Sequence, residues 1–112
     1  MSRERSAPGG MGMLLLALLE RRDMYGYEMI EALREQSNQV FHLKAGTLYP
    51  LLHSLEAQGW VSSSDGTANG RTRRYYAITE AGRAALAGQR AEWYAYADGV
   101  RGVLEGGVLC GA

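Results

Sequence analysis

Three leucines, Leu48, Leu52 and Leu55, recur at helical spacing in the segment KAGTLYPLLHSLEAQGW at residues 44–60. Residues three and four apart lie on the same face of a helix, so the leucines predict a face that is buried in a core. The other face carries aromatic, hydroxyl and imidazole groups and no acidic residue before Glu56. The chain must therefore bury one side of this helix and present a polar, non-acidic side outward.

Pro50 lies inside this segment, and a proline in the interior of a helix costs about 3 kcal/mol. The cost is avoided if Thr47 is the N-cap, because the first N–H groups of a helix have no partner within it. We therefore expect the regular helix to cover residues 48–58. A looser turn is expected to begin at Lys44, and Gly59 is expected to stop the helix.

The chain has 112 residues, of which 46% are hydrophobic, as expected for one small globular domain. Its 12 basic and 12 acidic residues balance, so attraction to a nucleic acid must come from a local patch. The apolar run at residues 11–19 is too short to span a membrane and is expected to be a buried helix rather than a signal peptide. The single cysteine, Cys110, excludes an intramolecular disulfide, and a cytoplasmic location is expected.

Two more helices are predicted before the leucine-bearing segment. The first covers residues 11–22 and is apolar on nearly every side, which indicates burial on most faces. The second covers residues 24–37, and Asp23 is expected to be its N-cap.

A β-hairpin and a long helix are predicted after it. Residues 60–62 and 73–78 have strand character, and the polar stretch SSSDGTANGRT between them predicts a long loop at the hairpin tip. Thr79 is a good N-cap for a last helix that continues to about Leu104.

This order of elements predicts a mainly α fold with a small β component: a winged helix-turn-helix with a long C-terminal dimerisation helix. We expect the winged domain at residues 11–79 and the last helix at residues 80–105, between flexible tails at residues 1–10 and 106–112. In helix-turn-helix proteins the last helix of the trio enters the major groove of DNA. The polar side of the leucine-bearing helix is therefore a candidate reading surface for double-stranded DNA.

Two groups of side chains in this region are candidates for DNA contact. The helix offers donors, an aromatic ring and an apolar surface for thymine methyl groups, from Lys44, Thr47, Tyr49, Pro50 and His53. The wing offers three positive charges within four residues, suited to phosphates, from Arg71, Arg73 and Arg74. The alternatives are a plain solvated helix face with a packed tyrosine, and a solubilising loop.

A stripe of six residues runs along the last helix at alternating spacings of three and four: Leu86, Gln89, Trp93, Tyr96, Val100 and Val103. This is the pattern of a helix that packs along another helix. The partner is either the chain's own apolar first helix or a second copy. We expect both, so that the first and last helices together form a homodimer interface. Trp93 and Tyr96 also offer a place for a flat hydrophobic ligand, with interface packing as the simpler explanation.

Catalysis is not expected. His42 and His53 are the only histidines, and neither has a partner at metal-ligand spacing. The glycines near residue 70 lack the Lys-Ser/Thr that follows a phosphate-binding loop. We therefore expect no metal, no cofactor and no enzymatic activity.

Three segments together resemble the PadR family of bacterial transcriptional regulators: MYGYEMIEAL at residues 24–33, KAGTLYPLLHSLEAQGWV at 44–61 and GRTRRYYAITEAG at 70–82. The resemblance is to the compact branch, with a single C-terminal helix that dimerises. Because most members are repressors, it implies a repressor that binds a palindromic operator and releases it on an inducer or a physiological signal. In some compact members a flat molecule binds at the dimer interface near an aromatic residue, which is the place of Trp93 here.

The resemblance also implies roles for individual residues. Tyr49 and Pro50 match the family's Tyr-Pro pair in the recognition helix, and Tyr25 and Tyr27 lie at the start of helix two, where contacts to the DNA backbone are expected. Ala45 stands where a proline is frequent, and that leaves the start of the recognition helix less defined. The alternative to a DNA-binding regulator is a winged-helix protein-interaction module that does not bind DNA.

Overall fold

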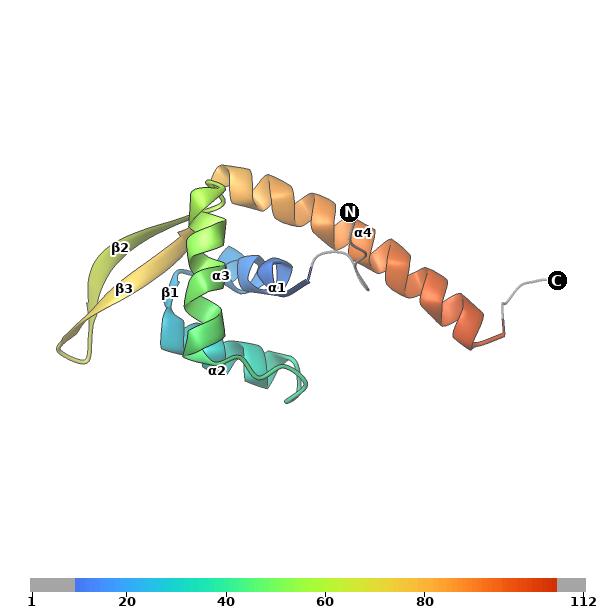
Figure 1. The fold of residues 1–112 in the computed structure, drawn as a ribbon, viewed down its shortest axis with the longest axis horizontal. Coiled ribbons are helices and arrows are strands. Elements are labelled where there is room, and N and C mark those ends of the chain that lie inside the picture. The colour runs from blue at the N-terminus through green and yellow to red at the C-terminus, as the bar shows by residue number, and fades with distance from the viewer. Residues whose placement is uncertain (1–9, 107–112) are drawn as a thin grey trace.

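The computed structural model describes residues 10–106 of the chain, and its elements form a winged helix-turn-helix with a long C-terminal helix (Figure 1). In chain order these are α1 (Gly10–Arg21), β1 (Met24–Tyr25), α2 (Gly26–Gln36), α3 (Ala45–Ala57), β2 (Val61–Ala68), β3 (Arg71–Ile78) and α4 (Glu80–Leu104). The three strands form one antiparallel sheet in the order β1-β3-β2. The expected fold class is confirmed.

The molecule is elongated, with extents of 61 × 29 × 27 Å. Helices α1, α2 and α3 form the body, and the β2–β3 hairpin projects from it on one side (Figure 1). Helix α4 starts at the base of the hairpin, passes over α1 and extends beyond the body in the opposite direction. None of the described helices is both long and apolar enough to cross a membrane.

The core lies between α1, α2, α3 and the base of the sheet. Leu48, Leu52 and Leu55 of α3 are all buried, as their spacing predicts. Burial of one leucine side chain contributes about 1.5–3 kcal/mol, so these three hold α3 firmly to the body. The expected buried character of the first helix is also confirmed, by Leu15, Leu16, Leu18 and Leu19 of α1.

Helix α3 begins earlier than expected. Lys44, not Thr47, is its N-cap, and the Lys44 carbonyl accepts the N–H groups of Thr47 and Leu48 at 2.9 and 2.8 Å. Pro50 therefore lies inside the helix, where its missing N–H leaves the Gly46 carbonyl without its usual donor. Gly46 is exposed, so water can hydrate that carbonyl and the cost of the proline is reduced.

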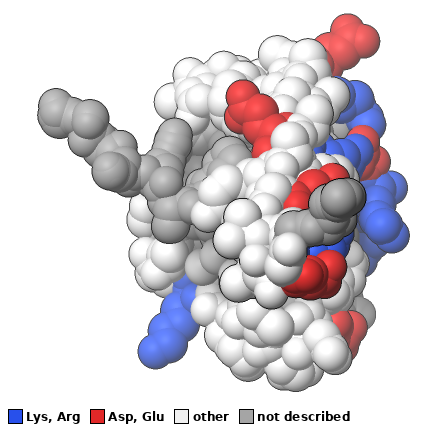
Figure 2. Space-filling model, turned by 90° about the vertical axis from the view of Figure 1, so that its right-hand side faces the viewer, with Lys and Arg blue, Asp and Glu red and all other residues white. Residues whose placement is uncertain are grey.

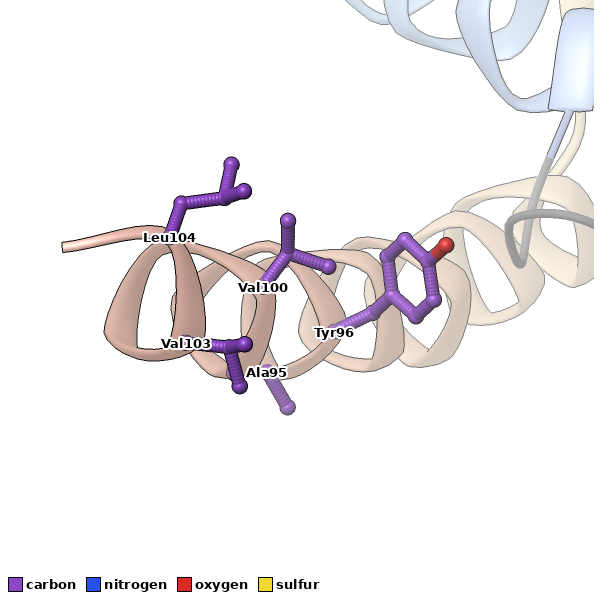
Figure 3. Close-up of a pocket in the computed structure, with 6 residues that line it drawn as sticks. Ala95, Tyr96, Val100, Val103 and Leu104 are labelled. Atoms are coloured by element: carbon purple, nitrogen blue, oxygen red, sulfur yellow. The ribbon is translucent and has the colours of Figure 1, made fainter. Parts of the chain in front are cut away.

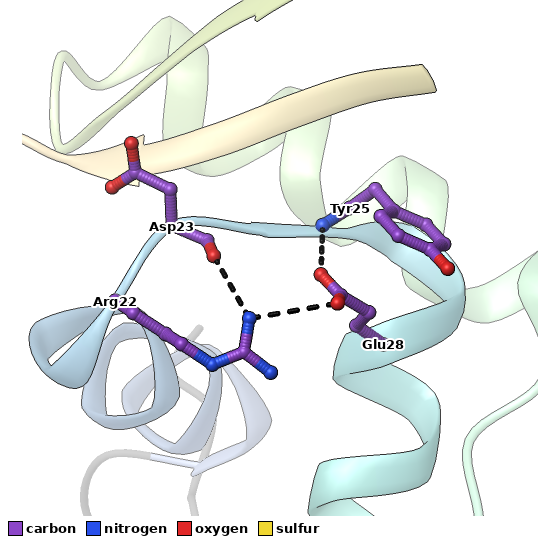
Figure 4. Close-up of polar contacts among 4 residues, drawn as sticks. All are labelled: Arg22, Asp23, Tyr25 and Glu28. Carbon is purple, nitrogen blue, oxygen red and sulfur yellow. Dashed lines mark hydrogen bonds and ion pairs between the residues drawn. The ribbon is translucent and has the colours of Figure 1, made fainter. Parts of the chain in front are cut away.

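The start of α2 also differs from the prediction. Asp23 is not the N-cap, because Met24 and Tyr25 are in strand β1 and pair with Tyr76 and Tyr75 of β3. The helix starts at Gly26, two residues later than predicted, and the Glu28 carboxylate accepts the Tyr25 N–H at 3.1 Å (Figure 4). Helical spacing in the sequence cannot report a pairing with a strand about 50 residues away.

The prediction of a long loop at the hairpin tip is wrong. Strands β2 and β3 pair over eight residues each, from Val61–Ile78 to Ala68–Arg71, and only Asn69 and Gly70 form the turn. Both turn residues have positive φ, +52° and +75°, as a two-residue hairpin turn of type I′ requires. The wing is therefore a regular ladder up to its tip.

The start of α4 is tied to the corner between α3 and β2. The Thr79 hydroxyl accepts the Gly82 N–H at 3.0 Å, so the expected cap is confirmed. The same hydroxyl donates to the Gly59 carbonyl at 2.6 Å, and the Thr79 N–H donates to the Trp60 carbonyl at 3.0 Å. A Cβ atom on Gly82 would overlap the Trp60 carbonyl, so only glycine allows this close approach.

The predicted start of the first helix and the predicted end of the last helix agree with the structure to within one residue. Helix α4 ends at Leu104, as expected, and α1 begins at Gly10, one residue before the expected start. The predicted tails fall mainly on residues 1–9 and 107–112, which include Cys110 and lie outside the described residues.

Candidate nucleic-acid interface

The outward face of α3 brings the five predicted reading residues together. Pro50 and His53 lie opposite the buried leucines, with Thr47 and Tyr49 on the two flanks, as the 100° step of a helix dictates. Lys44, Thr47, Tyr49, Pro50 and His53 are all exposed. The face offers hydroxyl, imidazole and apolar groups without a carboxylate.

Tyr49 both faces outward and packs against the start of α2. Its side chain is 40% exposed, and its hydroxyl lies where a Cβ atom on Gly26 would be. Gly26 is the first residue of α2, so the glycine lets the phenol of α3 close directly over the start of α2. This contact fixes the two helices of the helix-turn-helix against each other, and it is visible only in three dimensions.

Arg73 of the wing lies on an aromatic platform. Its Cζ atom is 4.9 Å from the centroid of the Tyr25 ring, and Tyr25 meets Tyr75 edge-to-face with ring centroids 5.5 Å apart. The Nε of Arg73 is buried, and the Arg73 side chain has no hydrogen bond or ion pair with any other described residue. Its charge is therefore available for an external anion.

Arg74 differs from its neighbour. Its Nη1 lies 3.2 Å from the Asp65 carboxylate, across the strand pair that joins these two residues. Both side chains are largely exposed, so the pair contributes little stability, but the carboxylate offsets the arginine's charge. Arg71, next to the turn, is exposed. The three wing arginines are thus not equivalent, which the sequence prediction did not distinguish.

The two tyrosines at the start of helix two are also separated by the structure. Tyr27 is exposed in the first turn of α2, whereas Tyr25 is half-buried beneath Arg73. The Tyr25 N–H is already bonded to Glu28, which also pairs with Arg22 at 3.5 Å (Figure 4). This N–H is therefore not free to bind a phosphate.

The α4 stripe divides into a packed part and an exposed part. Leu86 is only 1% exposed and belongs to the core of its own chain, which leaves a second copy almost none of its surface to contact. Gln89 and Trp93 are half-buried. Tyr96, Val100 and Val103 are exposed, as is Leu104, which the prediction omitted; Figure 3 shows them on the last turns of the helix.

An apolar groove of about 620 Å³ lies between α1 and α4. Its walls include Met11, Leu14, Phe41, Trp93 and Tyr94. The Trp93 and Tyr94 rings meet edge-to-face at 5.9 Å. Trp93 therefore lines the groove, and Tyr96 does not. The two side chains share only a shallower hollow farther along α4.

An ion pair lies across the same two helices. Arg90 of α4, which also lines the groove, donates from Nη2 to the Glu20 carboxylate of α1 at 2.8 Å. This hydrogen bond lowers the pKa of the Glu20 carboxyl below its usual value and raises the pKa of Arg90. Within residues 10–106, no three His, Cys, Asp or Glu side chains gather closely enough to hold a metal ion.

The pattern that defines the transcriptional regulator PadR-like family matches residues 15–88, which include the helix-turn-helix, the wing and the start of α4. The chain belongs to the PadR-like family. It is therefore a transcriptional regulator of a class that binds DNA, and not an enzyme.

Individual relatives of this PadR-family chain agree with this assignment. The chain is 47% identical over 57 residues to a transcriptional regulator of Mycobacterium tuberculosis, a match that covers 51% of this chain and 53% of that protein. It is similar in structure to a PadR family transcriptional regulator of Eggerthella lenta, with 32% identity, a TM-score of 0.69 and coverage of 85% and 84%. A Streptococcus mutans protein has 32% identity, a TM-score of 0.78 and coverage of 88% and 89%.

The structure of this PadR chain adds contacts that the sequence does not predict. Gly26 and Gly66 make room for Tyr49 and Tyr75, and Asp65 offsets Arg74. The Asn-Gly dipeptide was a usable signal for Asp65, since a two-residue turn at 69–70 sets residue 65 opposite residue 74. No sequence signal reports the glycine contacts.

Proposed function

We propose that this PadR-family regulator is a repressor that acts in the cytoplasm as a homodimer on a palindromic operator. One observation supports it above all. The non-acidic face of α3 and the unpaired Arg73 of the wing are joined through adjacent residues, because Tyr49 packs on Gly26 and Tyr25 lies under Arg73. Reading and phosphate-binding groups thus belong to one connected surface.

In this proposal α3 supplies sequence preference. It enters the major groove, where the Thr47 hydroxyl and the His53 imidazole meet base edges or phosphates and Pro50 meets thymine methyl groups. Lys44, Arg71 and Arg73 bind phosphates, which supplies affinity that is independent of sequence. Arg74 contributes less than Arg73, because Asp65 is beside it.

The far part of α4 supplies the dimer. Tyr96, Val100, Val103 and Leu104 leave an apolar surface exposed at the end of the molecule opposite the wing, and most of the surface visible from that end is uncharged (Figure 2). A second copy would cover this surface and place two reading heads on two half-sites. The α1–α4 groove at Trp93 is the proposed site for a flat hydrophobic effector.

The test is binding of the purified chain to duplex DNA from upstream of its own gene, against a scrambled duplex, across a salt series. We expect selective binding with a steep salt slope, since several phosphates are neutralised. Arg71→Ala should weaken binding to both duplexes, and His53→Ala should change the preference between them.

The competing function is a winged-helix protein-interaction module. Binding that is absent even at low salt would contradict the DNA-binding proposal and favour this module. Binding without any selectivity would contradict the operator-specific repressor, and unchanged affinity of Arg71→Ala would contradict the assignment of that residue to phosphate binding.

A further inference from the structure

Tyr25 has a position that a simple DNA contact does not explain. Its ring lies beneath the Arg73 guanidinium, 4.9 Å from ring centroid to Cζ, and its edge meets Tyr75 at 5.5 Å. The ring is half-buried and forms the support of Arg73. Arg73 has no acidic partner among the described residues, unlike Arg74.

The support is built from three strands. Gly66 is paired with Arg73 across the hairpin, and a Cβ atom at Gly66 would lie 2.8 Å from the Tyr75 ring. The glycine therefore lets the Tyr75 ring lie close to the β2 backbone, and in this position the ring contacts Tyr25 edge-to-face. Tyr25 in turn pairs with Tyr75 through the β1–β3 ladder.

The support is also fixed to the recognition helix. The Tyr25 N–H is held by Glu28, and the next residue, Gly26, is covered by Tyr49 of α3. Tyr25 cannot shift without disturbing one of these contacts. The place of the Arg73 guanidinium is therefore set relative to α3 as well as to the wing.

We propose that Tyr25 is a positioning residue for Arg73, which holds the guanidinium ready to bind a backbone phosphate of double-stranded DNA. An arginine side chain loses much rotamer freedom when it binds, and a stacked guanidinium has lost part of it beforehand. A planar guanidinium stacks on an aromatic face, whereas the compact ammonium of lysine does so less well. This inference rests on the proposed DNA binding, and it assigns to Tyr25 a role through Arg73 rather than its own phosphate contact.

The experiment is a double-mutant cycle measured as DNA affinity across a salt series. Tyr25→Leu should weaken binding by about 3- to 10-fold, the size expected for a partly exposed cation–π contact, whereas Tyr25→Phe should stay within about 2-fold of the parent. In an Arg73→Ala background, Tyr25→Leu should have no further effect. Tyr27→Leu is the matched control, and its effect should be the same in both backgrounds because Tyr27 is exposed and apart from the stack.

Arg73→Lys tests the contact between the guanidinium and the Tyr25 ring with both tyrosines in place. It can therefore replace Tyr25→Leu if that variant does not fold. It should lower affinity by about 3-fold while the salt slope stays unchanged, since the charge is kept. A parent chain that binds DNA together with a Tyr25→Leu variant of equal affinity would overturn the positioning role alone. Equal losses in both Arg73 backgrounds would also overturn it. A parent chain that does not bind DNA would overturn the proposed function as well.

Discussion

The first half of α4 and its last three turns carry the same spacing of apolar residues but meet different surroundings. In the first half, Leu86 is buried by the body of its own chain and Arg90 is paired with Glu20 of α1. In the last turns, Val100 and Val103 are exposed, the latter by 80%. Helix α1 has 12 residues and α4 has 25, so at 1.5 Å per residue α1 can cover only about half of α4.

The difference teaches what helical spacing reports. An alternating stripe predicts that one face will be covered, and it says nothing about which chain covers it. The length of the available partner decides that. The stripe from Leu86 to Val103 is continuous in the sequence, yet the structure gives its start to the core and leaves its end open.

The largest expected effect comes from the packed half. Leu86→Ala should lower the free energy of unfolding by about 2–5 kcal/mol, because it removes a fully buried side chain and leaves a cavity between α1 and α4. Urea unfolding at low protein concentration measures it. Val100→Ala is the matched control and should change the value by less than about 0.5 kcal/mol. Similar losses in both variants would remove the distinction between the two halves.

A smaller effect on folding but a clear effect on association is expected from the exposed half. Val100→Asp should weaken self-association by at least about 30-fold, because an unpaired charge is costly inside an apolar interface. Sedimentation at several concentrations measures it, with circular dichroism to verify that the fold is kept. Ala91→Asp places the same charge on the opposite side of α4 and should leave association nearly unchanged. A parent chain that sediments as a monomer would contradict the dimer itself.

The smallest effect concerns the ion pair that joins the packed half to α1. The Arg90 hydrogen bond lowers the pKa of Glu20, so the pair stabilises the fold above the usual carboxyl pKa of 4.5 and loses this contribution as the pH falls through the lowered value. Because the two side chains are 42% and 37% exposed, we expect only about 0.2–1 kcal/mol.

Glu20→Gln should therefore be less stable than the parent at pH 6, and this difference should shrink as the pH falls through the lowered pKa of Glu20, as measured by urea unfolding. Glu92→Gln, on the helix that carries Arg90, is the control for the loss of one negative charge, and it should change the free energy of unfolding at pH 6 by less than Glu20→Gln does. A Glu20→Gln difference that persists unchanged at pH 3 would show that the ion pair is not its source.

Much of the fold was predictable because it depends on local signals. The buried leucines of α3, the Thr79 cap and the end of α4 follow from spacing, a hydroxyl side chain and glycine content. The errors arose where distant residues decide. Met24 was predicted as helix but pairs with Tyr76, and the polar residues 63–68 were predicted as loop but are held by pairing with β3.

The candidate interface was predictable as a list of residues but not as an arrangement. Exposure of Pro50 and His53 follows from the leucine face alone. The unequal charges of Arg73 and Arg74 depend on the hairpin register, and the contact of Tyr49 with Gly26 depends on how two helices cross. A sequence pattern contains neither the hairpin register nor the crossing of the two helices.

The two hydrogen bonds that Thr79 donates to the Gly59 and Trp60 carbonyls have a mechanical consequence. They fasten the start of α4 to the end of α3 and to the base of the wing. Leu86 and Arg90 hold the first half of the helix to the body, and only its last turns form a rigid arm. An arm of half the helix, roughly 12 residues, is about 18 Å long, so a turn of about 5° at its base moves its far end by about 1.6 Å. Conversely, a partner that grips the far end of α4 would act with the leverage of this arm on the body that carries α3 and the wing.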